Sequence, residues 1–254
     1  MAFQFLQRLT GRDRTRTANR QLGGVLAFVA GAVNAGGFLA VARYTSHMSG
    51  IISGIADDLA LGSVGLALAG LVALGAFVSG AACTSLLINW GRHRQLQGKY
   101  ALALLLEAGL LLLFGLLGAN LHDFKALLVP TTVLLLCFIM GLQNAIVTKI
   151  SNAEIRTTHM TGVVTDLGIE LGRLLYWNGQ RDADDPMYVR ANRDKLWIHA
   201  TVLALFFSGG IVGALAFRSL GFSATIPLAA LLAVMALPAL AGDLHRIAPA
   251  RFRH

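Results

Sequence analysis

The same motif occurs twice in this chain, as TSHMSGIISGIADDLALG at residues 45–62 and as TTHMTGVVTDLGIELG at residues 157–172. Both copies read T-(S/T)-H-M-(S/T)-G before they diverge, and Asp58 in the first copy then corresponds to Glu170 in the second. Weaker matches flank the motif on both sides. They pair GAVNA at 31–35 with GLQNA at 141–145, and Ser79-Gly80 with Ser208-Gly209. The ordered agreement of several blocks indicates an internal duplication.

The composition indicates that lipid is the main solvent of this protein. The chain has 254 residues, of which 56% are hydrophobic and only 13% charged, and its mean hydropathy is +0.65. So few charges cannot cover a water-soluble surface of this size. A membrane-spanning helix needs about 20 mainly apolar residues. The sequence supplies six such runs, near 21–42, 64–90, 100–119, 129–150, 196–217 and 223–241.

We therefore predict an all-α membrane protein of six transmembrane helices, arranged as two three-helix repeats over 21–120 and 121–242. An odd number of spans in each repeat makes the two repeats face opposite ways in the membrane. A helix over 48–62 would be only about 22 Å long, against about 30 Å of hydrocarbon. We expect each motif to form a short re-entrant or broken helix after the first span of its repeat.

The cations predict the orientation of the chain. The net charge is +8, and the Lys and Arg residues gather in the tails at 1–20 and 243–254, after the second span, and in the hydrophilic loop at 173–195. Because cytoplasmic loops carry an excess of Lys and Arg, both tails and this loop are predicted to be cytoplasmic in a bacterial inner membrane. This explanation is favoured over binding of nucleic acid or anionic lipid by the tails. The loop at 173–195 is predicted to be solvated, with a gating or docking role as the alternative.

The cysteines do not suggest a cofactor. Cys83 and Cys137 each lie alone in a predicted span, without a CxxC partner, so neither a disulfide framework nor a zinc site is indicated. We expect no metal and no cofactor. The predicted partners are the lipid bilayer, a small polar or ionic substrate, and further copies of the chain in a homo-oligomer, with no nucleic acid.

The sequence resembles a known group of membrane proteins. The G-x-x-N-A block, the T-x-H-M-(S/T)-G block and above all the stretch MGLQNA to RTTHMTG at 140–162 are similar to the YoaK family of bacterial membrane proteins. The resemblance covers roughly 20–242. It implies an inner-membrane location and a shared fold, but no substrate, because the domain of that family has no known function.

Each motif predicts a polar face on its short helix, because residues three or four apart share one face of a helix. The faces comprise His47, Gly50, Gly54 and Asp58 in the first copy, and His159, Gly162, Asp166 and Glu170 in the second. Thr45 and Thr157 stand where capping residues are common, and free N–H groups behind them suit an anion or a polar substrate group. The alternative is that these small polar segments only hold membrane helices together.

Glu107 is a further candidate, because it interrupts an apolar run. An ionisable group at membrane depth costs at least about 2.5–3.5 kcal/mol on insertion scales. Glu107 is predicted to be buried with Gln143, Asn144, His159 or Arg156 as its partner, or else to reach the headgroups near Lys99 and Arg94. Asn34, Gln143 and Asn144 are expected to bind substrate or to bond between helices.

Small residues every four positions predict close helix packing. They run as Gly23, Ala27, Gly31 and Ala35 in the first span, and as Cys137, Gly141 and Ala145 in the fourth. We expect these two stripes to form tight helix contacts, of which one between the two stripes themselves is the simplest.

Three functions are compatible with these patterns. The first is a small secondary transporter or permease with a polar site between the two motif segments. The second is an intramembrane enzyme that uses the histidines and acids as general acid and base or as metal ligands, although no HExxH or GxSxG signature occurs. The third is a non-catalytic scaffold or accessory subunit. The duplicated polar face favours the first, and an enzyme is the less favoured reading.

Overall fold

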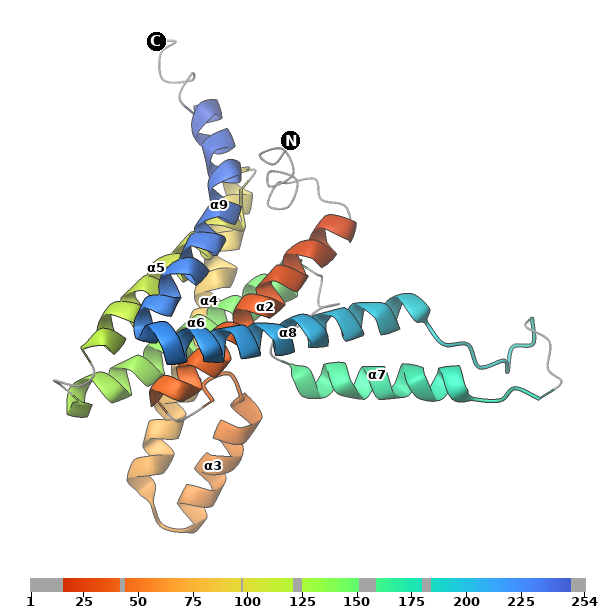
Figure 1. The fold of residues 1–254 in the computed structure, drawn as a ribbon, viewed down its shortest axis with the longest axis horizontal. Helices are drawn as coiled ribbons and strands as arrows, with labels where there is room; N and C mark the ends of the chain where they lie inside the picture. Colours follow the sequence, from red (N-terminus) through yellow and green to blue (C-terminus); the bar gives the residue numbers. More distant parts are fainter. Residues whose placement is uncertain are drawn as a thin grey trace.

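The computed structural model describes residues 16–41, 44–96, 98–120, 125–150, 159–179 and 184–247. Within these ranges every regular element is helical, so the prediction of an all-α protein is confirmed (Figure 1). The elements are α2 (Arg16–Val41), α3 (Met48–Ala60), α4 (Val64–His93), α5 (Ala101–Ala119), α6 (Lys125–Ile150), α7 (Met160–Leu175), α8 (Arg193–Leu220), the 3-10 helix η1 (Gly221–Ala224) and α9 (Thr225–Ile247).

Five helical stretches of the described chain are long and apolar enough to cross a membrane. They are Thr17–Leu39, Val64–His93, Ala101–Ala119, Leu128–Ile150 and Arg193–Asp243, the last of which joins α8, η1 and α9. In α4 only 17% of the most apolar window is buried within the protein. Large apolar side chains of α4 such as Leu68, Leu71, Val78 and Leu86 are exposed, as expected where lipid is the solvent. The chain is a multi-pass membrane protein.

Both motifs form the short helices predicted for them. Helix α3 begins at Met48 and α7 begins at Met160, and in each case the motif histidine, His47 or His159, is the residue before the helix. The N-cap residue of each helix makes no side-chain capping bond. The prediction that Thr45 caps α3 is therefore wrong, because the helix starts two residues later.

The centre of the molecule is a crossing of α2 with α8, where the two backbones touch. A methyl group on Gly31 would overlap the carbonyl oxygen of Phe206, and one on Gly209 would overlap that of Phe28. Helices α6 and α4 cross in the same manner. Here a methyl group on Gly141 would overlap the carbonyl oxygen of Phe77, and one on Gly80 would overlap that of Phe138.

These crossings explain the small-residue stripes. The glycines of α2 and α6 meet α8 and α4, and not chiefly each other as we had expected. A hydrogen bond reinforces the second crossing, since Thr84 Oγ1 donates to the carbonyl oxygen of Leu142 at 3.0 Å. Helices α5 and α9 pack together beside the crossings. Three aromatic rings connect α5, α8 and η1, with centroids 5.7–6.3 Å apart: those of Phe114, Phe217 and Phe222.

Two hairpin arms project from this core. The first arm is α3 with the N-terminal half of α4, and the second arm is α7 with the N-terminal half of α8. Figure 1 shows the two arms leaving the core in different directions, so that the C-terminal ends of α3 and α7 lie far apart. The crossings are therefore the rigid centre, and the arms that carry the motifs lie outside it.

The crossings yield a prediction about stability. Gly31→Ala and Gly141→Ala each place a methyl group against a carbonyl of the partner helix. Because overpacking of a close contact costs about 1–3 kcal/mol, both variants should unfold at a lower temperature in detergent. Gly75→Ala is the control, because a methyl group there meets no atom within 4 Å and alanine favours the helix. If all three variants were as stable as the wild type, the crossings would not hold the fold.

Candidate functional site

The first arm borders a half-open cavity of about 850 Å³ between α3, α4 and α6. The four residues of the predicted polar face, His47, Gly50, Gly54 and Asp58, all line it. The opposite walls are mostly apolar and include Leu66, Gly70, Val72, Val133, Leu134 and Cys137. The small residues on α3 leave the space open, since a methyl group on Gly54 would meet no atom within 4 Å.

Three aromatic rings stack along one end of this cavity. The ring centroids of Phe38 and Tyr44 are 4.4 Å apart with the planes 20° from parallel, and those of Tyr44 and His47 are 4.9 Å apart. All three residues line the cavity. Phe38 lies on α2, and the turn that carries Tyr44 and His47 is fixed by a buried bond, in which Ser46 Oγ donates to Asn34 Oδ1 at 2.6 Å. Asn34 thus holds the turn in place, and Thr45 is buried in the cavity wall.

Asp58 stands at the other end of α3. Its side chain is half-buried, whereas that of the neighbouring Asp57 is exposed. Within the described part of the chain, no cation or hydrogen-bond donor contacts the Asp58 carboxylate. The cavity therefore combines a stack of rings, a carboxylate without a partner and apolar walls.

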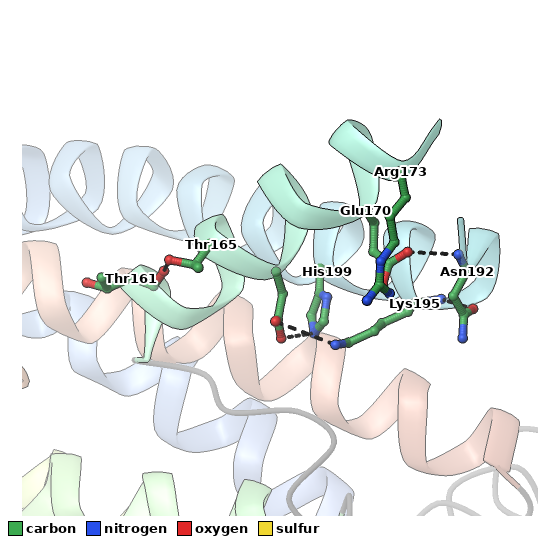
Figure 2. A network of polar contacts seen from close by, with 8 residues as sticks. Thr161, Thr165, Glu170, Arg173, Asn192, Lys195 and His199 are labelled. Carbon is green, nitrogen blue, oxygen red and sulfur yellow. Dashed lines mark hydrogen bonds and ion pairs between the residues drawn. The ribbon is translucent and has the colours of Figure 1, made fainter. Parts of the chain in front are cut away.

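The second arm uses its acids differently, to hold α7 against α8. Asp166 lies between Lys195 and His199 of α8, with one oxygen 3.5 Å from Lys195 Nζ and the other 3.6 Å from His199 Nε2. Figure 2 shows Lys195 and His199 reaching from α8 toward α7. This polar face is thus filled by side chains of the protein.

Glu170 completes the contact between α7 and the start of α8. Its side chain is 1% exposed. One oxygen accepts a hydrogen bond from Arg173 NH1 at 2.9 Å, and the other accepts one from the backbone N–H of Asn192 at 2.8 Å (Figure 2). The Asn192 side chain caps α8, where its Oδ1 accepts from the N–H of Lys195 at 3.0 Å. Glu170 therefore has a structural role.

The two arms differ because of a few substitutions at matching positions. When α4 and α8 are aligned at Gly80 and Gly209, Leu66 corresponds to Lys195 and Gly70 corresponds to His199. Counting on from the two histidines in the same way, Leu61 stands where the second arm has Arg173. The first arm thus lacks the cations that neutralise the acids of the second.

The described residues do not form the single pocket that we had expected between the two motifs. No residue of α7 lines the first-arm cavity, α3 packs on α4, and α7 packs on α8. The structure brings His47 and Asp58 to one cavity and places Asp166 and Glu170 in a separate cluster. His159 is exposed at the start of α7. Thr157 and Arg156 lie outside the described residues.

The remaining candidates lie in the core. Glu107 on α5 is 0% exposed, which excludes the prediction that it reaches the headgroups. Neither of its carboxylate oxygens has a hydrogen-bond partner. Gln143 is equally buried, and its Nε2 lies 3.5 Å from the carbonyl oxygen of Leu26, which it can reach as a donor. Asn144 Nδ2 donates to the carbonyl oxygen of Met140 at 3.0 Å, so these two amides bond mainly to backbone.

The sequence analysis did not predict that Lys195 and His199 contact Asp166. It also did not predict the ring stack of Phe38, Tyr44 and His47. Lys195 and His199 are four residues apart, and that spacing alone indicated a shared helix face. Among the described residues no three His, Cys, Asp or Glu side chains come together as a metal site would require. Cys83 and Cys137 are free thiols.

Comparison with known proteins assigns a family but no activity. No curated protein and no solved structure matches the chain. A family model described as a protein of unknown function, DUF1275, matches residues 22–237, which include both motifs and all the elements that form the cavity. The chain therefore belongs to the DUF1275 family of proteins of unknown function.

Proposed function

We propose that this protein is a small permease for an organic cation, and that the first-arm cavity is its substrate site. In this proposal the chain has six spans, both termini are cytoplasmic in a bacterial inner membrane, and the two halves form an inverted repeat. The observation that carries the proposal is the half-buried Asp58 carboxylate, which lines the cavity without a partner among the described residues.

The paired crossings support the repeat. Gly31 and Phe28 on α2 contact α8 as Gly141 and Phe138 on α6 contact α4. These residues match under the alignment of GAVNA with GLQNA. Each short helix also packs on the helix that follows it, α3 on α4 and α7 on α8. Transporter folds of this kind carry their substrate sites on broken helices of the repeats.

The walls of the cavity favour a cation with apolar groups. A carboxylate that is partly removed from water is unfavourable unless a positive charge compensates it. The faces of Phe and Tyr rings attract cations, and Phe38, which lines the cavity, has only one of its faces covered by the ring stack. The volume of about 850 Å³ lies within the range typical of small-molecule sites. A quaternary ammonium ion satisfies all of these conditions.

The second arm supports the same chemistry. There the counterpart of Asp58 is Glu170, which Arg173 neutralises at 2.9 Å. In the first arm Leu61 takes the position of Arg173 and carries no charge. A bound cation would therefore supply the positive charge beside Asp58 that the Arg173 side chain supplies beside Glu170. The enzyme and scaffold hypotheses gain no specific observation of this kind from the described residues.

Transport of a quaternary ammonium ion tests the proposal. In proteoliposomes the wild type should take up radiolabelled tetraethylammonium faster than protein-free liposomes. Asp58→Asn removes the charge but keeps the shape, so it should abolish this uptake. Asp57→Asn is the matched control, because Asp57 is the adjacent residue and its side chain is exposed outside the cavity. This variant should retain the wild-type rate of uptake. Uptake that is absent in the wild type, or complete in Asp58→Asn, would refute the proposal.

Reporter fusions test the six-span topology. An even number of crossings places both termini on one side, whereas five crossings would separate them. Alkaline phosphatase fused after Asn120 or after Gly221 should be active, because it is exported. Green fluorescent protein fused after Gln95 or at the C-terminus should fluoresce in the cytoplasm. An active phosphatase at the C-terminus would contradict the topology.

A further inference from the structure

Glu107 is a buried acid that the cavity does not explain. It lies near the middle of α5, is 0% exposed, and has no hydrogen-bond partner at either carboxylate oxygen. An ionised carboxylate in such a place would lose its hydration and gain nothing in return. Within a membrane-spanning helix, an acid of this kind marks a functional site by default.

The neighbouring helix contributes a second unsatisfied acceptor at the same depth. Helices α5 and α6 are antiparallel, and Tyr100 at the start of α5 donates through its hydroxyl to the carbonyl oxygen of Lys149 near the end of α6, at 3.3 Å. Counting the same number of residues inward from this bond brings Glu107 level with Leu142 and Gln143. The side-chain oxygen of the buried Gln143 also has no partner. Among the described residues neither the two Glu107 oxygens nor the Gln143 side-chain oxygen receives a hydrogen bond, and a proton on Glu107 would turn one of these acceptors into a donor.

The charged groups of the packed helices lie away from Glu107. Lys149 on α6 is level with Tyr100, about two helical turns from Glu107. On α9, Asp243 accepts from the backbone N–H of Gly98 at 2.9 Å, beyond the same end of α5. Other cations on this side are Arg20 on α2, Arg92 and His93 on α4, and Lys99. None of these described groups forms a hydrogen bond or an ion pair with the Glu107 carboxylate.

We propose that Glu107 is held as a neutral carboxylic acid and carries the proton that the permease exchanges for its cationic substrate. This role rests on the proposed function, although the protonation state itself does not. When the proton leaves, the O–H bond of Glu107 breaks, water accepts the proton as hydronium, and the electron pair stays on the carboxylate. Hydronium on the opposite side of the membrane returns a proton to the carboxylate and becomes water, which restores the acid. Helix α6 belongs to both sites, because it lines the cavity with Val133, Leu134 and Cys137 and carries Gln143 further along.

Infrared spectroscopy tests the neutral acid without any substrate. At pH 7 the wild type should show the C=O stretching band of a protonated carboxyl group. The band should be missing in Glu107→Gln, which has the same size and no charge and should fold normally. Glu107→Asp keeps an acid and should keep the band at a shifted frequency. Identical spectra for the wild type and Glu107→Gln would overturn the proposal.

Transport then tests the coupling. A higher proton concentration inside the liposomes should accelerate tetraethylammonium uptake by the wild type. Glu107→Gln should lose this acceleration but still exchange labelled for unlabelled tetraethylammonium across the membrane. Acceleration that persists in Glu107→Gln would overturn the coupling role while leaving the permease intact. A wild type with the infrared band but no uptake would support the neutral acid and refute both transport roles.

Discussion

Backbone contact at two glycine crossings is the constraint on which the rest of this structure depends. Lipid tails are as apolar as the side chains that face them, so helices in a membrane associate through close packing and not through a hydrophobic driving force. Gly31 and Gly209 permit this approach between α2 and α8, and Gly141 and Gly80 permit it between α6 and α4. Each crossing joins a helix of one half to a helix of the other half. The two halves are therefore interlocked, and neither can form the core alone.

The crossings hold the core without the arms, and the two arms carry different side chains at matching positions. In the second arm Lys195 and His199 face Asp166, and Arg173 faces Glu170, so the polar face is closed by charges of the protein. In the first arm Leu66, Gly70 and Leu61 take those positions, and an open cavity results. The same motif thus serves as a structural contact in one arm and as the wall of a candidate binding site in the other. The functional proposal rests on this difference.

Local patterns in the sequence predicted the helices and the polar face of each motif. They did not predict which helices and side chains these faces contact. Helix positions follow from the length of apolar runs, and the face of His47, Gly50, Gly54 and Asp58 follows from helical spacing. The separation of the arms does not follow from either rule, because it depends on which helices the glycines meet. No pattern in the sequence indicated that Glu170 accepts a hydrogen bond from the backbone N–H of Asn192, 22 residues further along the chain. The burial of Glu107 was among the alternatives, but its lack of any partner required coordinates.

The central claim is that the first-arm cavity binds a cation, and protection of a cysteine placed inside it tests this most directly. The Cβ of a cysteine at position 54 would meet no atom within 4 Å. Once Cys83 and Cys137 have been replaced by serine, the reaction of this cysteine with a methanethiosulfonate reagent can be timed. The account predicts that tetraethylammonium slows this reaction in a concentration-dependent way. A cysteine at Gly65, which is exposed at the start of α4 and outside the cavity, should react at an unchanged rate. Equal rates with and without tetraethylammonium at position 54 would contradict the account.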